Sequence, residues 1–328
     1  MKFGFWPTCL IAVLLIWGIV LPFGAEAAST GSILIDVVPE NPVPGENVTI
    51  SLNSYANNLY TVLITWYVSG KNTLSGIGKK TFMLNAPNTG SETNVTAVVA
   101  LPDGTVEVKV VVRPATMELL WQAEDSYVPP FYRGKALPTA DSEIKVVAMP
   151  EIKTNAGQIN PKNLVYEWKK DYSNIKDGSG YGKNSFAYVN DYLDDSNNIS
   201  VTASTADQAY SSTASVTVPI WEPKILFYKN DAELGTIWEQ ALNDGYRIEG
   251  AEILEAAPYF ISPKDLRIPS LVWSWFINDA PVKIEGIKKN IIPLQAQSGI
   301  SGTSKIRLEI GNKYKLFQNA SKEINVDF

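Results

Sequence analysis

The chain has no histidine and a single cysteine, Cys9, among 328 residues. Ser-His-Asp triads and Cys-His nucleophile pairs need an imidazole, so the composition excludes both. Cys9 lies in an N-terminal segment that we expect to be removed, and its loss would also exclude disulfides and thiolate metal sites. We therefore predict that the protein is not an enzyme and that it uses no cofactor.

Positive charge is also in the minority. The sequence has 28 Lys and Arg against 34 Asp and Glu, for a formal net charge of −6. An acidic chain without a basic block repels nucleic acid, whose phosphates dominate such binding. We expect no nucleic-acid partner.

The first 27 residues are typical of a secretory signal peptide. Lys2 precedes an uncharged apolar stretch, residues 3–25, which contains the helix breaker Pro22 and leads to small residues up to Ala27. This pattern predicts cleavage after Ala27. The alternative is an uncleaved anchor, because a hydrocarbon core needs only about 20 apolar residues. Either reading places the protein outside the cytoplasm: in the periplasm, on the cell surface or secreted. We expect membrane contact only through this segment, if it is uncleaved.

The rest of the chain is an internal repeat. Trp66, Trp168 and Trp275 each stand near the end of a similar apolar strand, roughly a hundred residues apart. A second phrase follows each Trp, rich in Gly and Lys in all three copies and ending in Phe82 or Phe186 in the first two. Such a period is too long for a solenoid repeat and suits a domain with its own core. We predict that these three Trp and two Phe residues form the structural core of three domains.

Each copy has the pattern of β-structure. In the first, Val48, Ile50 and Leu52 alternate with polar residues, which is typical of a strand with one buried face. Further short apolar runs follow, and Asp103-Gly104 is a strong hairpin signal. Several strands in so few residues favour a two-sheet sandwich. The predicted domains span residues 29–114, 115–221 and 222–328.

A Trp on the third strand, followed by a Gly-rich turn and a strand that carries Phe, resembles bacterial immunoglobulin-like and PKD-like domains. This resemblance covers the mature chain and implies an all-β protein of three tandem immunoglobulin-like β-sandwiches after the signal peptide. The chain lacks the cysteine pair that flanks the Trp of antibody domains, so packing must replace that bridge. Residues 127–135 and 257–260 are also similar to exported surface proteins of candidate-phylum bacteria, a resemblance that implies no activity.

Two insertions interrupt the repeat. Residues 122–141 lengthen the first connection of the second domain with an aromatic and proline cluster. Exposed Tyr, Phe and Pro supply rigid contact area for a protein or a sugar, although the same cluster could fill a junction between domains. The interaction candidates are Tyr127, Pro129, Pro130, Phe131 and Tyr132. In the third domain, residues 231–244 have apolar residues at helical spacing and predict a short helical insertion.

Three further motifs favour structural roles. Gly78-Lys79 is followed by Lys80 rather than Ser or Thr, so a phosphate loop is not expected. The oxygen-rich run that contains Asp191, Asp194 and Asp195 could hold Ca²⁺, but it lacks EF-hand spacing and is more typical of a polar turn.

Paired carboxylates for glycoside hydrolysis could come from Glu124, Asp125, Glu252 and Glu255, but no pattern in the sequence brings them together in a cleft. Glu252 and Glu255 flank a predicted strand, where we expect them to face solvent.

The domains are joined by short segments that contain proline, which predicts a stiff, elongated rod. We expect a non-catalytic, exported cell-envelope protein that acts as a multi-domain spacer or protein-interaction module, with other envelope or surface proteins as partners. One alternative is a module that binds envelope polysaccharide. Another is an accessory subunit of a surface filament or secretion assembly, in which residues 323–328 or an edge strand complete a neighbour's sheet.

Overall fold

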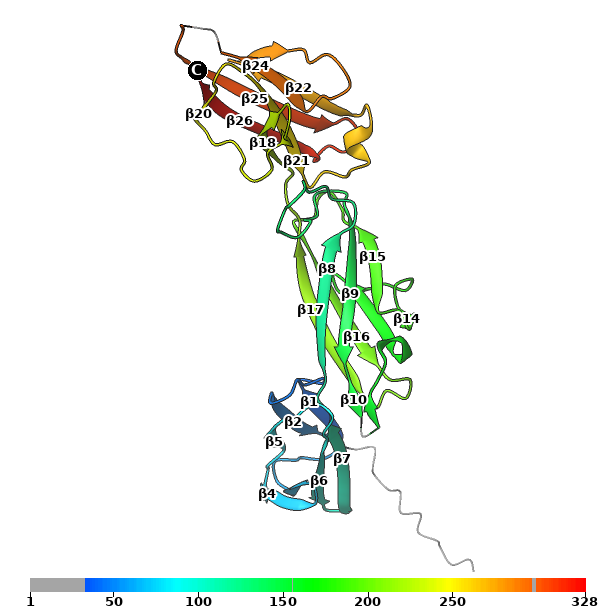
Figure 1. Cartoon of the computed structure of the whole chain (residues 1–328). Helices are drawn as coiled ribbons and strands as arrows, with labels where there is room; N and C mark the ends of the chain where they lie inside the picture. The colour runs from blue at the N-terminus through cyan, green and yellow to red at the C-terminus, as the bar shows by residue number, and fades with distance from the viewer. Residues whose placement is uncertain (1–32, 155, 297–298) are drawn as a thin grey trace, which may run out of the picture.

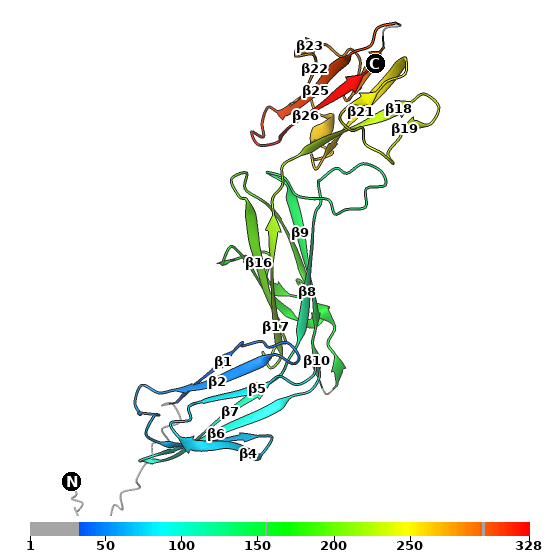
Figure 2. The ribbon, with the colours of Figure 1, turned by 90° about the vertical axis from the view of Figure 1, so that its left-hand side faces the viewer.

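The computed structural model describes residues 33–154, 156–296 and 299–328, so the proposed signal peptide lies outside the described residues. Figures 1 and 2 show β-sandwiches arranged end to end, and the long axis of the first is turned away from that of the second. Among the described residues, helix is limited to two 3₁₀ turns, η1 (Pro161–Asn163) and η2 (Asp265–Arg267). The predicted all-β class, with three tandem immunoglobulin-like sandwiches, is confirmed.

The first sandwich packs a three-stranded sheet, β1-β2-β5, against a four-stranded sheet, β4-β3-β6-β7. Its strands are β1 (Leu34–Val38), β2 (Asn47–Asn53), β3 (Leu63–Val68), β4 (Lys71–Ile77), β5 (Thr81–Asn85), β6 (Thr93–Leu101) and β7 (Gly104–Val112). All neighbours in both sheets pair antiparallel.

The second sandwich repeats this order, with sheets β15-β9-β8 and β13-β12-β16-β17 and with β14 also paired to β12. Its strands are β8 (Thr116–Ala123), β9 (Glu143–Glu151), β12 (Val165–Lys170), β13 (Ser173–Asn174), β14 (Gly180–Tyr181), β15 (Ser185–Val189), β16 (Ser196–Ser204) and β17 (Ser211–Pro219). A small hairpin, β10 (Lys153–Thr154) with β11 (Gly157–Gln158), extends it.

The third sandwich has the same topology with two added strands, in sheets β19-β18-β21-β24 and β20-β26-β25-β22-β23. Its strands are β18 (Lys224–Asp231), β19 (Gly235–Thr236), β20 (Tyr246–Arg247), β21 (Ala251–Tyr259), β22 (Leu271–Ile277), β23 (Ala280–Val282), β24 (Ile291–Gln295), β25 (Thr303–Asn312) and β26 (Asn319–Asp327).

One Trp lies at the centre of each sandwich. Trp66 and Trp168 are 0% exposed and Trp275 is 2% exposed. Phe82 lies 5.3 Å from Trp66 between ring centroids, and Phe186 lies 4.9 Å from Trp168. Each buried indole contributes at most about 4–6 kcal/mol, from 150–250 Å² at about 25 cal/mol per Å². This is comparable to the 2–5 kcal/mol, roughly, that a native disulfide gives a small domain.

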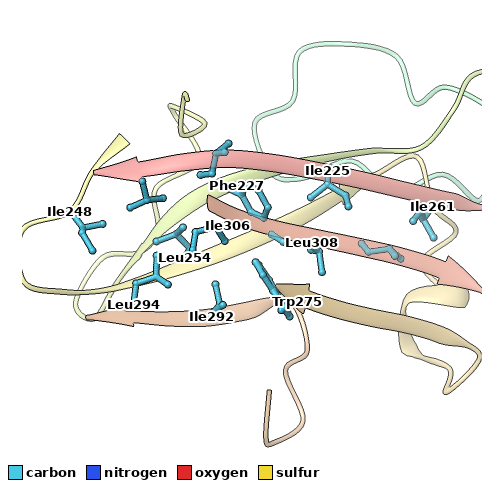
Figure 3. Packing of buried hydrophobic residues seen from close by; sticks show 14 of the residues in the cluster. Ile225, Phe227, Ile248, Leu254, Ile261, Trp275, Ile292, Leu294, Ile306 and Leu308 are labelled. Atoms are coloured by element: carbon cyan, nitrogen blue, oxygen red, sulfur yellow. The ribbon is translucent and has the colours of Figure 1, made fainter. Parts of the chain in front are cut away.

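The third copy fills the same place differently. The partner ring of Trp275 is Phe227, 5.6 Å away, which comes from β18 on the opposite sheet. Figure 3 shows Trp275 pointing into the core with Phe227, Ile292 and Leu308 around it. Ile292 occupies the position that corresponds to Phe82 and Phe186. Because Phe227 supplies the ring beside Trp275, the third copy of the Gly- and Lys-rich phrase does not need a Phe there.

The predicted helix at residues 231–244 is wrong. The segment runs along an edge strand instead, with Ile237 N–H donating to Lys229 O at 2.9 Å and Leu242 N–H to Phe227 O at 2.7 Å. Directly after the segment the chain crosses to the other sheet, where β20 pairs in parallel with β26. Amides that a helix would use internally thus satisfy the carbonyls of exposed sheet edges. Within the described part of the chain, we find no helix of the length and apolarity that crossing a bilayer requires.

Candidate functional site between the second and third sandwiches

The loop that joins β8 to β9, residues 124–142, reaches from the second sandwich to the third (Figure 2). Tyr127 N–H donates to Ile261 O at 2.9 Å, and Phe260 N–H donates back to Tyr127 O at 2.7 Å. The buried hydroxyl of Thr139 adds a hydrogen bond to Phe260 O at 3.0 Å. The loop is therefore fixed to the next sandwich by backbone as well as by side-chain contacts.

An aromatic cluster seals this junction. The ring of Tyr132 packs edge-on against Tyr259, 5.6 Å away, and Phe260, 6.2 Å away. Tyr259 and Phe260 are buried, and the hydroxyls of Tyr259 and Tyr228 share a hydrogen bond. Burial is the main cause that raises the pKa of Tyr259 well above its ordinary value, and this hydrogen bond is the second cause.

The structure divides the five interaction candidates between two environments. Tyr132 packs in the junction, Pro129 is buried, and Tyr127 is half-buried beside the third sandwich. Pro130 and Phe131 lie at the apex of the loop, where Phe131 is 82% exposed with a φ of 63°. The cluster thus supplies both a junction and an exposed aromatic ring.

A cleft of about 750 Å³ opens beside the junction. Tyr127 and the half-buried Trp273 are its aromatic lining residues. Arg267, from η2, and Lys288, from the turn before β24, are exposed at the same cleft. Neither cation forms a salt bridge within the described residues. The cleft therefore combines aromatic surface with unpaired positive charge, although the chain as a whole is acidic.

Glu255, the carboxylate of this cleft, is held by neutral donors. It accepts hydrogen bonds from Asn230 Nδ2 at 2.8 Å, from Asn290 Nδ2 at 3.1 Å and from the Thr236 hydroxyl. Burial of Tyr127, with the charge of Glu255 next, raises the pKa of the Tyr127 phenol. These hydrogen bonds fix Glu255 as an acceptor in the wall of the cleft.

The expectation that Glu252 and Glu255 flank a strand and face solvent is wrong. Both lie within β21, and the side chain of Glu252 is 7% exposed, with bonds from Tyr246 Oη at 2.7 Å and Lys229 Nζ at 3.2 Å. Burial opposes the charge of Glu252, but these hydrogen bonds outweigh it and lower its pKa. A general acid for glycoside hydrolysis needs the opposite shift.

The calcium candidates have protein partners. Lys170 Nζ lies 3.4 Å from Asp194, which also accepts from Asn197 Nδ2 at 2.7 Å. Asp191 accepts from Leu193 N–H at 2.9 Å, as in a polar turn. In the chain segments described, no three carboxylates, Asp195 included, are grouped to hold a metal ion. The ammonium of Lys170 therefore supplies positive charge beside Asp194, where a bound metal ion would otherwise supply it.

The sequence did not single out the residues that make the cleft. Trp273 shares the strand alternation of Trp275, so the pattern cannot separate the rim residue from the core residue. Arg267 and Lys288 lie in connections whose positions depend on the fold. The sequence signals for this place are Tyr127 and Glu255.

No family model matches the chain, and no curated protein matches it. Among solved structures it is similar to the fibronectin(III)-like modules of Clostridium thermocellum CbhA, with 17% identity, a TM-score of 0.27 and coverage of 57% of this chain and 94% of that one. It is also similar to the central fibronectin-III array of RIM-binding protein, with 8% identity, a TM-score of 0.31 and coverage of 90% and 96%. Immunoglobulin domains 1–4 of Sidekick-1 give 11% identity, a TM-score of 0.21 and coverage of 90% and 98%.

These likenesses concern the fold alone. By its own topology the chain is a tandem of immunoglobulin-like sandwiches in which the fourth strand joins the sheet of the buried Trp, as β4 does beside β3. In constant-type immunoglobulin domains that strand lies on the other sheet. The resemblance to candidate-phylum surface proteins stays a prediction.

Proposed function

We propose that the protein is a non-catalytic, exported spacer and interaction module of the cell envelope, in which loops hold three sandwiches at fixed relative orientations. Tandem sandwiches of this class fit a multi-domain spacer or interaction module. The observation that carries the proposal is that side chains and backbone bridge both junctions. Export rests on the sequence of residues 1–27, and envelope proteins remain the expected partners.

The first junction is built around Arg113, in the segment between β7 and β8. Its Nε lies 2.9 Å from Glu92 of the first sandwich, and its Nη1 donates to Ala209 O of the second at 3.3 Å. The guanidinium also lies 4.9 Å from the ring centroid of Tyr210. Nearby, Asn41 Nδ2 donates to Thr213 Oγ1 at 3.1 Å. One planar cation thus contacts both sandwiches, which restricts their relative motion.

Small-angle X-ray scattering of the chain from residue 28 tests the rod. We expect an extended distance distribution that matches the structure and does not change with protein concentration. Tyr132→Ser should broaden the distribution, because it removes the ring that packs on Tyr259 and Phe260. The matched control Phe131→Ser removes an exposed ring of the same loop and should leave the profile unchanged. A compact or multi-shaped wild-type profile contradicts the spacer.

Polysaccharide binding is the second candidate, and the cleft favours it. Two aromatic faces beside unpaired Arg267 and Lys288 suit a sugar that carries carboxylate or phosphate. Calorimetric titration with acidic and neutral polysaccharides tests this: Trp273→Ala should abolish binding of the acidic form. Trp221→Ala, at a 42% exposed ring outside the cleft lining, is the control. Equal loss in both variants contradicts a site in the cleft.

The strand-exchange alternative has less support. The last strand, β26, pairs with β25 from Asn319 to Asp327 and with β20 on its other side. Deleting residues 323–328 should therefore destabilise the third sandwich itself, because buried Ile324 and Val326 would leave its core. A deletion that left stability intact would restore this alternative.

A further inference from the structure

Each sandwich has one end at which the strand connections of its two sheets meet, and in two copies a preceding sandwich covers that end. In the second copy, Arg113 of the preceding linker contacts Ala209 and Tyr210, between β16 and β17. In the third copy, Tyr127 bonds to Ile261, between β21 and β22. In the second and third sandwiches, this end therefore forms an interface with the sandwich that precedes it.

In the first sandwich nothing in the described chain covers this end, and apolar side chains project from it. We name the first-sandwich tip as the five large apolar residues that gather there. They are Tyr55, 97% exposed, Ile77, 69%, Tyr60, 67%, Leu34, 50%, and Leu63, 48%. Two tyrosines and three aliphatic residues at one end exceed the scattered exposure that a soluble surface normally shows.

The residues of the tip form one surface. Leu34, Tyr55 and Tyr60 line the same hollow of about 470 Å³, together with Lys80. Leu63 and Ile77 are direct neighbours on β3 and β4. Turns hold the loop in place: Ser54 Oγ accepts from Ala56 N–H at 3.3 Å, and Asn58 Oδ1 accepts from Tyr60 N–H at 3.1 Å. The apolar side chains are thus presented by an ordered loop.

Two lysines lie at the tip. Lys80 Nζ lies 4.5 Å from the ring centroid of Tyr60, and Lys79 is its exposed neighbour. The carboxylates of this end are Asp103, in the turn between β6 and β7, and Asp36, which is exposed on β1 two residues beyond Leu34. Within the described residues neither lysine forms a salt bridge. The tip therefore combines apolar side chains with two lysines that no carboxylate pairs, in a chain of net charge −6.

A second copy of the chain does not offer the matching surface. The sandwiches cover their neighbours with the connection after their first strand, as Asn41 and Tyr127 show. In the third sandwich the equivalent residues, 232–250, are bonded to its own edge strands β18 and β26. Head-to-tail docking of copies would therefore need a loop that is already in use.

A lipid surface matches the tip in both chemistry and position. Tyrosine is enriched at membrane interfaces, and lysine is attracted to anionic headgroups. Leu34 belongs to the tip, so the described chain begins at this end, and the apolar run at residues 3–25 would be tethered here if it stays uncleaved. From Ala25 to Ile33 the chain spans about 30 Å at most. We propose that the first-sandwich tip docks on a lipid surface that carries anionic headgroups.

Vesicle co-sedimentation tests this on the chain from residue 28, which contains every described residue and lacks the apolar run. The probes are phosphatidylcholine vesicles with and without phosphatidylglycerol. We expect stronger partition onto the anionic vesicles, and a loss of about tenfold or more in Tyr55→Ser/Tyr60→Ser/Ile77→Ser, since each side chain loses its apolar contact. Lys79→Gln/Lys80→Gln should reduce only the anionic preference.

The matched control carries the same changes on the second sandwich, Tyr172→Ser/Tyr181→Ser/Leu193→Ser. These side chains are 88%, 64% and 71% exposed, close to the values at the tip. The control should bind like wild type. If the triple tip variant loses its thermal transition, Tyr55→Ser alone, at a 97% exposed side chain, replaces it and should reduce partition measurably.

Three outcomes overturn the proposal. Wild-type chain that stays in solution with both vesicles has no lipid-docking tip. A tip variant that partitions like wild type, or a control that loses as much, places any lipid contact elsewhere. Light scattering that finds a dimer abolished by the tip variant, without vesicle binding, assigns the tip to a second copy. None of these outcomes bears on the scattering test of the rigid rod, so the two proposals fail separately.

Discussion

The indole N–H of Trp168 donates a hydrogen bond to the backbone carbonyl of Lys183 at 2.9 Å. Trp66 makes the same bond to Lys79 at 2.7 Å, and Trp275 makes it to Lys289 at 2.9 Å. The two phrases that recur through the sequence are therefore donor and acceptor of one contact. A buried indole N–H needs an acceptor, and the Gly-rich turn supplies it.

The same turn also ties the two sheets of each sandwich together. The carbonyl one residue further along accepts from a strand of the opposite sheet: Leu52 N–H donates to Lys80 O at 2.9 Å, and Ala148 N–H donates to Asn184 O at 2.8 Å. In the third copy, Ala256 N–H donates to Asn290 O at 2.7 Å. The turn thus does in all three copies what a bridging disulfide does in antibody domains.

Trp168→Phe tests the contact, because it keeps an aromatic ring and removes the donor. We expect a loss of about 2–4 kcal/mol in the free energy of unfolding, from an unsatisfied buried carbonyl and a small cavity. Calorimetry of the second sandwich's transition measures it. Trp221→Phe, at a 42% exposed ring, should change the same quantity by less than about 0.5 kcal/mol. Equal losses of unfolding free energy in the two variants would mean that the hydrogen bond from the Trp168 indole does not contribute to stability.

The turn depends on one glycine for its shape. Gly78 has a φ of 71°, and a Cβ at this position would lie 2.9 Å from Tyr60 O, a backbone atom that cannot easily move. Gly70 has a φ of 82° with nothing within 4 Å of its would-be Cβ. Gly70→Ala should therefore cost only about 1 kcal/mol, for the left-handed backbone, and Gly78→Ala about 1–2 kcal/mol more. Chemical denaturation compares the two, and similar midpoints would contradict the steric account.

Period-two alternation and the position of the Trp were enough to predict the all-β class. A sheet that buries one face needs apolar residues at every second position, so both features can be recognised in the sequence. β4 escaped prediction because only Leu74 of its seven residues is both large and partly buried before the exposed Ile77. The helix at residues 231–244 was predicted wrongly because β18, the edge strand directly before this segment, takes its amides, and spacing alone does not show which strand will be an edge. The cleft was not predicted either, because Tyr127 and Trp273 belong to different sandwiches and line the same cleft only after the junction has formed.

The contacts of Arg113 with both sandwiches predict that its side chain limits their relative motion at the first junction. Arg113→Lys keeps the charge near Glu92 but loses the planar group that reaches Ala209 O and lies over Tyr210. We expect a wider distribution of distances between spin labels on the first and second sandwiches, with little change in thermal stability. The chain from residue 28 lacks cysteine, so introduced cysteines at Thr105 and Tyr172 label it uniquely. Lys109→Arg, at a 70% exposed side chain, is the control, and an equal effect there would remove the special role of Arg113.

Alkaline pH should destabilise the second sandwich through Tyr166. Burial raises the pKa of its phenol to about 12 from an ordinary value of 10.0, and its hydroxyl donates to Pro161 O at 2.8 Å. A folded pKa above the unfolded one gives stability that is complete below pH 10 and is lost as the pH rises toward 12. Tyr166→Phe removes the ionising group, so its unfolding free energy should be lower at neutral pH but fall less steeply over this range. Chemical denaturation from neutral pH to pH 11 measures both slopes, with Tyr172→Phe, at an 88% exposed ring, as the control. A Tyr166→Phe slope equal to that of wild type would mean that this phenol ionises as easily in the folded chain as in the unfolded one.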